Sequence, residues 1–187
     1  MSIDAQANLR TIRDVLRYAV TRMNEAGVFF GHGQADSVDE ALFLVLRSLQ
    51  LPLERADLFL DAFLTHAEIN TLLQAVDQRA RKRVPAAYIL REAWLQGYKF
   101  YVDERVIVPR SFLAELLKDG LAPWVHKPEA VADLLDMCTG SGCLAIIAAD
   151  VFPQAQVDAA DISPDSLAVA RRNIADYQMD RRVSPVQ

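Results

Sequence analysis

Two aspartates, Asp136 and Asp161, stand at the ends of two short apolar runs, and a glycine loop follows the first of them. The loop reads Cys-Thr-Gly-Ser-Gly-Cys over residues 138–143. Glycine lets the backbone turn sharply and lets a ligand approach where a Cβ would block it. Acids placed around such a loop could hold an ammonium group and the ribose hydroxyls of one nucleoside ligand.

A strand, a loop, a helix and a second strand must position these groups. The apolar run before Asp136 predicts a strand, and residues 144–151 carry apolar side chains at helical spacing. A second apolar run leads to Asp161, and Ser163-Pro164-Asp165 predicts the start of another helix. This order, with an acid about 20 residues after the glycines, is typical of the mononucleotide-binding half of a doubly wound parallel sheet.

The glycine loop alone leaves two classes of enzyme open. Gly140, Gly142 and Ala145 also satisfy the dinucleotide pattern G-x-G-x-x-G/A, which favours a nicotinamide-dependent oxidoreductase. Asp136 argues for the other class, because it precedes the glycines and would face the ammonium of an amino-acid-like ligand. S-adenosylmethionine has that ammonium and offers its ribose to Asp161. A structural alternative is that Asp136 only caps the loop backbone.

Composition narrows the class of protein. The chain has 187 residues, 52% of them hydrophobic, and a net charge of −5, which fits one globular domain or two small ones. The acidic balance argues against nucleic-acid binding driven by phosphate neutralisation. Cys138 and Cys143 have the spacing of neither a zinc site nor a redox pair, so we interpret them as reduced packing residues of a cytoplasmic protein. We expect no metal site and no membrane span.

Residues 1–84 predict an all-helical unit. Helical periodicity covers about 5–25, 37–49, 55–64 and 65–83, and capping boxes are expected at 37–40 and 65–68. Positive charge gathers at the end of the last helix, where it suits the helix dipole; contact with ribosomal RNA is the alternative. His32, between two glycines, belongs either to a binding loop or to a loop packed on the helices.

Residues 85–110 predict a β-hairpin. Side chains alternate from Ala93 to Val102, the run 103–105 is expected to turn the chain, and 106–108 to return it. Pro109-Arg110 closes the hairpin, and restrained backbone there could fix the position of Arg110. A short helix up to Gly120 and a linker should follow, before the strand that ends at Asp136.

Together these features resemble the HemK-type protein-glutamine N5-methyltransferases, and most closely the branch that modifies large-subunit ribosomal protein three. The markers are the Phe-Gly-His-Gly run at 30–33, Tyr-Val-Asp-Glu-Arg-Val at 101–106 and Asp-Met-Cys-Thr at 136–139. The resemblance implies an α/β fold in three parts. A helical substrate-recognition domain (1–84) and a β-hairpin linker (85–110) precede a partial, Rossmann-like methyltransferase domain (111–187) that uses S-adenosyl-L-methionine.

The resemblance also assigns roles to residues. Asp136, Gly140 and Gly142 would hold the methionine part of the donor, and Asp161 the ribose. The loop residues Cys138 and Thr139 would line the same site. The remaining cofactor-binding candidates lie in the hairpin segment beside the pocket, and they are Phe100 and Arg110.

One departure from the family concerns the catalytic motif, Asn-Pro-Pro-Tyr at the end of the fourth strand, which the 187 residues do not contain. The motif orients a carboxamide nitrogen toward the sulfonium methyl group. We therefore expect no catalytic residue here and interpret the chain as an inactive N-terminal fragment. An open, apolar edge on the first strand should lead to self-association, to disorder near the C-terminus or to weakened cofactor binding. Alternatively, the helical unit is a non-catalytic module that binds a ribosomal protein.

Overall fold

The computed structural model describes residues 8–31 and 33–187, and the chain divides into two compact units, Met1–Leu90 and Arg91–Gln187. Each unit has its own buried apolar core. The expected α/β fold, with a helical part before a Rossmann-like part, is confirmed. No helix within these described ranges combines the length and apolar character needed to cross a membrane.

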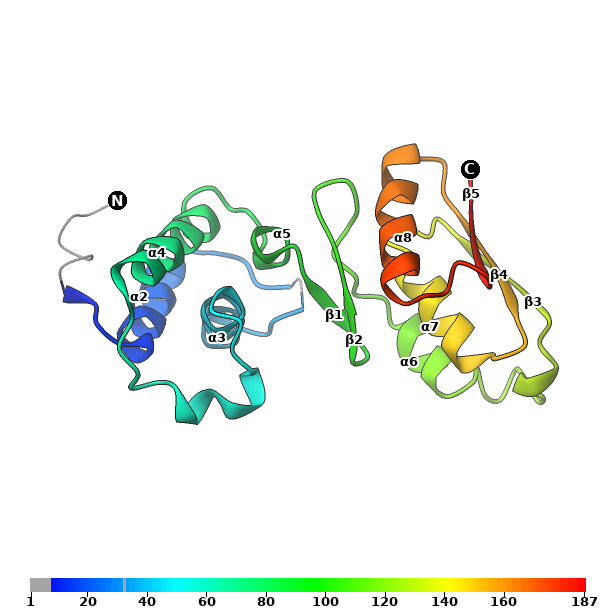
Figure 1. Ribbon diagram of the computed structural model, residues 1–187, viewed down its shortest axis with the longest axis horizontal. Coiled ribbons are helices and arrows are strands. Elements are labelled where there is room, and N and C mark those ends of the chain that lie inside the picture. The colour runs from blue at the N-terminus through cyan, green and yellow to red at the C-terminus, as the bar shows by residue number, and fades with distance from the viewer. Residues whose placement is uncertain (1–7, 32) are drawn as a thin grey trace. The chain divides into compact units, whose positions relative to one another are not determined.

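The first unit is helical, as Figure 1 shows. Its elements are α2 (Ile12–Glu25), α3 (Ser37–Ser48), the 3₁₀ helix η1 (Leu53–Leu58), α4 (His66–Ala80) and α5 (Ala86–Leu90). Apolar residues at helical spacing on α2, α3 and α4 face one another, and the largest fully buried ones are Met23, Leu44, Leu46 and Leu72. Burial of these apolar faces is the main force that holds the short helices together.

Capping decides where the helices begin. The helix expected over about residues 5–25 is interrupted: Asn8 is helical, but residues 9–11 are not, and α2 begins at Ile12. Thr11 and Asp14 form a capping box there, in which the Asp14 N–H donates to Thr11 Oγ1 (3.2 Å) and the Thr11 N–H donates to the Asp14 carboxylate (2.9 Å). Residues 5–7 lie outside the described part of the chain. The capping box predicted at Thr65 and Glu68 is confirmed.

The capping box predicted at 37–40 is wrong. The helix is capped one residue earlier by Asp36, whose carboxylate accepts the N–H groups of Val38 (2.8 Å) and Asp39 (3.0 Å). Glu40 turns into the core, where it meets the guanidinium of Arg79. A buried charge must be paired. The ion pair between Glu40 and Arg79 therefore forms in place of the bond from Glu40 to the backbone at the start of the helix.

The helix predicted over 55–64 is also wrong in extent. A 3₁₀ helix covers only 53–58, and residues 60–64 bond instead to the chain that enters α2. The Arg13 N–H donates to the Leu60 carbonyl (2.9 Å), and the Leu64 N–H donates to the Arg10 carbonyl (2.8 Å). A backbone N–H has only one hydrogen to donate, so the Leu64 N–H cannot also bond to the Leu60 carbonyl, as a helix that reached residue 64 would require.

The basic run at the end of α4 is used within the unit. Arg83 donates to the carbonyls of Ala26 (2.5 Å) and Gly27 (2.8 Å) just after α2, and Arg81 pairs with Asp77 (3.2 Å). Arg79 is buried. Three of the four basic residues of the run, Arg79, Arg81 and Arg83, therefore have partners within the unit.

The second unit contains a parallel sheet in the order β3-β4-β5, with β3 (Asp133–Met137), β4 (Gln156–Ala160) and β5 (Val183–Val186). Two helices connect the strands, α7 (Cys143–Val151) and α8 (Pro164–Asp176), and both lie on the same side of the sheet (Figure 1). Ser163 caps α8 as predicted, accepting the Ser166 N–H (3.2 Å). β3 is the outer strand next to β4.

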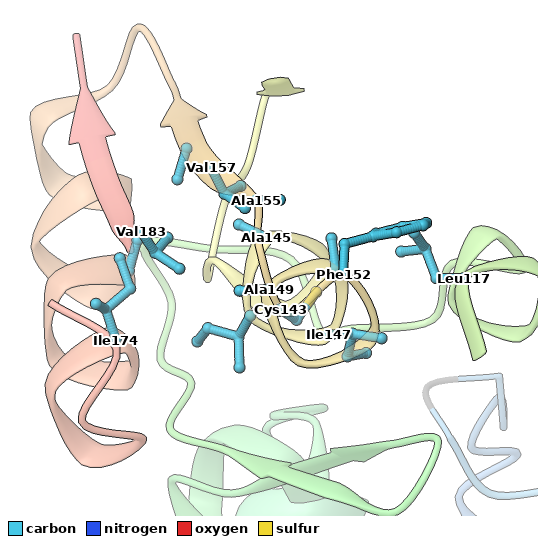
Figure 2. Close-up of a cluster of buried hydrophobic side chains, with 14 of the residues drawn as sticks. Leu117, Cys143, Ala145, Ile147, Ala149, Phe152, Ala155, Val157, Ile174 and Val183 are labelled. Carbon is cyan, nitrogen blue, oxygen red and sulfur yellow. The ribbon is translucent and has the colours of Figure 1, made fainter. Parts of the chain in front are cut away.

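Alternate residues of the strands face a continuous core. Figure 2 shows Val157 and Val183 from the strands together with Ala145, Ile147 and Phe152 around α7. The opposite face of the sheet is open, since Leu135 and Met137 on β3 are 58% and 66% exposed.

The hairpin is shorter than predicted and turns at a different place. β1 (Ala93–Leu95) pairs with β2 (Tyr98–Phe100), and the turn lies at Gln96 (φ 50°) and Gly97 (φ 84°). Positive φ at both central residues is the type I′ geometry that matches the twist of paired strands. The predicted turn at 103–105 is therefore wrong as the hairpin turn, and residues 106–108 form no return strand.

Side-chain bonds attach the hairpin to the helices of its unit. The Tyr98 hydroxyl donates to Asp150 on α7, and the Lys99 N–H donates to the Tyr177 hydroxyl (2.9 Å) after α8. Beyond the hairpin, α6 (Leu113–Lys118) ends before Gly120, whose positive φ (65°) is typical of a helix terminus. The 3₁₀ helix η2 (Pro128–Ala130) then leads into β3.

Candidate functional site

A tight turn connects β3 to α7 at the carboxyl edge of the sheet. Cys138, Gly140 and Gly142 all have positive φ (60°, 56° and 79°). The Thr139 N–H donates to the Ala160 carbonyl at the end of β4 (2.9 Å), and the Gly142 N–H donates back to the Thr139 carbonyl (2.9 Å). These bonds hold the loop against the neighbouring strand, where ligands bind in open parallel sheets.

The two glycines serve different purposes. A Cβ at Gly142 would lie 3.2 Å from the Cβ of Ala170 on α8, so this glycine allows α7 to begin close to α8. A Cβ at Gly140 would meet no atom within 4 Å. Gly140 therefore adopts its left-handed backbone beside open space, which leaves its surface free for a ligand.

Asp136 and Asp161 both bond to this loop. Asp161 accepts the N–H groups of Gly140 and Ser163, each at 2.9 Å, and Asp136 accepts the Thr139 hydroxyl at 2.6 Å. The structure thus brings together the two predicted acids from the ends of neighbouring strands. The bond of Asp136 is to the hydroxyl of the Thr139 side chain, so the alternative that Asp136 only caps the loop backbone stays a prediction.

The electrostatics of the pair favour a cationic ligand. Burial raises the pKa of the Asp136 carboxyl, and the nearby negative charge of Asp161 adds to the rise, while the Thr139 hydroxyl opposes it. A carboxylate in this position is stabilised by a positive charge placed beside it. An ammonium group near Asp136 would supply that charge, and the ribose hydroxyls of the same ligand could donate to Asp161.

The other candidate residues differ in exposure. Phe100 is fully buried, and its ring packs against Tyr98 and Tyr177, so contact with a ligand would require its side chain to move. Arg110 is exposed after the buried Pro109. Their roles as ligand contacts stay predictions.

The loop cysteines and the histidine complete the set. Cys138 is exposed and Cys143 is buried, and both are free thiols. His32 lies outside the described residues. Among the residues that the structure does describe, no group of three or more histidine, cysteine or acidic side chains could hold a metal ion.

Sequence reasoning missed Asn173. This residue of α8 is 1% exposed and bonds to the loop residue Ser141 and to Tyr101 after the hairpin. Only its place on the buried face of a predicted helix, about two turns after Ser166, could have drawn notice to it.

Comparison with known proteins shows which sequences the site resembles. Residues 116–186 match the family model described as the methyltransferase small domain. This part of the chain is thus similar in sequence to that domain. This match begins in α6 and covers the two carboxylates, the glycine loop and all three parallel strands.

Curated relatives extend the similarity over nearly the whole chain. The ribosomal protein uL3 glutamine methyltransferase of Burkholderia pseudomallei is 55% identical over 94% of this chain and 57% of its own length. The protein of the same name from Bordetella pertussis is 53% identical over 98% of this chain and 62% of its own length. The expected resemblance to glutamine methyltransferases is thus confirmed. The chain spans about three fifths of the length of these relatives.

A solved structure is also similar in part. The apo form of the S-adenosylmethionine-dependent methyltransferase SibL matches 93% of this chain and 61% of its own, at 19% identity and a TM-score of 0.31. That likeness is too weak to identify a fold.

Proposed function

We propose that this chain supplies the helical domain and the donor-binding half of an enzyme that uses S-adenosyl-L-methionine to methylate a glutamine side chain of ribosomal protein uL3. The observation that carries the proposal is the pair Asp136 and Asp161, which hold one glycine loop from two adjacent strand ends. The relatives named above support the substrate and, with it, a place in the cytoplasm.

Each residue of the site takes a part in binding the donor. Asp136 receives the ammonium group, and the open surface of Gly140 lets the methionine chain lie against the loop. Asp161 receives the ribose hydroxyls, while Cys138 and Thr139 line the turn. When bound, the donor supplies a methyl group on a sulfonium, and the protein's task is to orient that group toward the carboxamide nitrogen of the substrate.

The helical unit is proposed to recognise the substrate protein. A groove of about 330 Å³ lies along α2 and α3, and its apolar lining includes Leu16, Val20 and Leu42. Val38 also lines it and is 51% exposed. An apolar segment of uL3 could bury its side chains there.

Calorimetry with the chain tests the donor site. We expect S-adenosylmethionine to bind and NAD not to bind, and Asp136→Asn to weaken binding of the donor by at least about tenfold, because a hydrogen bond or ion pair to a charged group is lost. Binding of NAD but not of the methyl donor would overturn the proposal in favour of an oxidoreductase.

Binding of purified uL3 tests the helical unit. Val38→Glu should weaken binding to the chain, because it places a charge at the apolar groove. Leu58→Glu is the matched control, since Leu58 is 58% exposed and does not line that groove. Equal effects of the two substitutions would remove the groove from the proposal while leaving the donor site untouched.

A further inference from the structure

Asn173 on α8 bonds at once to the glycine loop and to the chain that leaves the hairpin. Its amide nitrogen donates to the carbonyls of Ser141 (2.8 Å) and Tyr101 (3.0 Å), and its amide oxygen accepts the Tyr101 N–H (2.8 Å). Both amide hydrogens are therefore used, and the side chain is 1% exposed. A buried amide with these three bonds has one allowed orientation.

The bond to Ser141 acts on a peptide that is also held from its other side, because the Gly142 N–H of the same peptide donates to the Thr139 carbonyl (2.9 Å). Ser141 stands between Gly140 and Gly142, the two residues with the widest conformational freedom. Its carbonyl direction is coupled through the peptide plane to the position of the Gly142 N–H, and through its own backbone to Gly140, whose N–H bonds to Asp161. Asn173 thus fixes the peptide next to the donor-binding surface.

The bond to Tyr101 gives Asn173 a rigid support. The Tyr101 hydroxyl donates to Asp103 (2.9 Å), and the guanidinium of Arg172 lies 3.5 Å from the ring centroid. Asp103 is buried and accepts three donors of Arg105, which are its backbone N–H, Nε and Nη2, with the shortest bond at 2.6 Å. The side chain of Tyr101 is thus held by groups other than Asn173, and Tyr101 in turn gives the Asn173 amide a fixed partner on the side away from the loop.

We infer that Asn173 is a positioning residue for the donor: it holds the Ser141 peptide so that the glycine loop keeps its binding-competent shape. This inference rests on the proposed function, since it concerns the same loop. Asn173 touches no substrate or donor in this account. It acts through Ser141, and through Tyr101 it makes the shape of the loop depend on the anchoring of the hairpin.

Two substitutions separate positioning from packing. Asn173→Ala leaves the Ser141 carbonyl without its donor and leaves both backbone groups of Tyr101 unpaired. Asn173→Asp keeps the acceptor for the Tyr101 N–H but points a charged oxygen at the two carbonyls. The matched control is Ile174→Ala, because the neighbouring Ile174 is equally buried, at 1% exposed, and belongs to the apolar core.

The test measures donor affinity and loop protection together. Calorimetry with S-adenosylmethionine is done at a temperature where thermal unfolding shows every variant folded, and amide exchange at Gly140 and Gly142 is followed by NMR. We expect both Asn173 variants to bind the donor about tenfold or more weakly than the wild type. Their Gly140 and Gly142 amides should also exchange faster than those of the wild type, with the amides of strand β4 as the internal reference. Ile174→Ala should bind within about twofold of the wild type, although it is less stable.

The outcomes distinguish failure of the proposed donor binding from failure of the positioning role of Asn173. If the wild-type chain fails to bind the donor, the proposed function fails, whatever Asn173 does. If the wild type binds and the Asn173 variants match Ile174→Ala in affinity and in glycine exchange, the positioning role is refuted and the proposed function stands. If neither Asn173 variant folds, the wild-type protein still tests the positioning role by NMR. Its Asn173 side-chain amide signals must shift when the donor saturates the protein, and unchanged signals would refute the inference.

Discussion

Glu40→Gln is expected to destabilise the helical unit strongly. Glu40 and Arg79 are 3% and 4% exposed, and the guanidinium donates to both carboxylate oxygens of Glu40 and to the Phe29 carbonyl (2.9 Å). The substitution keeps the shape but leaves a buried positive charge without its counterion. Removing one partner of a buried pair costs about 3–5 kcal/mol, and we expect about 3 because glutamine keeps one acceptor. Domains of this size are stable by only about 5–15 kcal/mol.

Urea unfolding followed by far-ultraviolet circular dichroism measures this loss. Fluorescence would report on the other unit, because both tryptophans, Trp94 and Trp124, lie in residues 91–187. Hydrogen exchange of peptides from α3 and α4 assigns the change to the helical unit. The control is Asp61→Asn, which breaks an ion pair on the surface. The Arg13 and Asp61 side chains of this pair are 58% and 79% exposed. Its unfolding midpoint should stay close to that of the wild type.

Equal shifts for Glu40→Gln and Asp61→Asn would refute the reasoning from burial. A second refutation is available from the double variant in which methionine replaces both Glu40 and Arg79. Removing both charges together should restore much of the stability, because no unpaired charge then remains in the core. A double variant no more stable than Glu40→Gln would mean that shape, and not charge, sets the cost.

Three further predictions concern the second unit. Burial raises the pKa of Asp136 above the ordinary value of 3.8, so ionising it costs folding free energy. The wild type should therefore lose stability as pH rises above 3.8 through the raised pKa, and pH-dependent urea unfolding should show that Asp136→Asn removes this loss while weakening donor binding. Gly142→Ala should cost more stability than Gly140→Ala in thermal unfolding: both have left-handed backbones, worth about 1–2 kcal/mol, but only Gly142 would also meet Ala170. Burial and the hydrogen bond to Asp150 raise the pKa of Tyr98 from 10.0 to about 12. Ultraviolet titration should therefore show a tyrosine ionisation near pH 12 that Tyr98→Phe removes. The free energy of unfolding should fall as the pH rises from 10 through 12.

Local signals predicted the elements whose ends are set by local bonds. The Thr65 capping box and the Ser163 cap lie within a few residues of the groups they satisfy, and both were predictable from sequence. The box expected at Ser37 failed because Glu40 has a partner 39 residues away, in Arg79. No pattern near residue 40 carries that information.

The hairpin shows a different limit. Alternation of apolar and polar residues continued through Gln96 and Gly97, and it concealed the turn that those two residues form. Alternation alone therefore misplaces the turn, although a glycine in the middle of an alternating run is itself a turn signal.

The candidate site was predictable in part, where its residues lie close together in the sequence. Asp136, Asp161 and the glycines follow one another closely in a strand-loop-helix order that dictates their meeting at one edge. Asn173 depends on bonds to residues 32 and 72 positions away, and an asparagine within a helix has no local pattern that predicts such partners.

The open face of β3 makes Met137 a natural chemical reporter. Its side chain is 66% exposed next to the glycine loop, whereas Met23 in the helical unit is completely buried. Mild peroxide should convert Met137 to its sulfoxide while sparing Met23. Any partner or ligand that covers this face will slow the oxidation of Met137. Mass spectrometry of the oxidised peptides therefore measures how much of the sheet surface is covered, with Met23 as the internal standard.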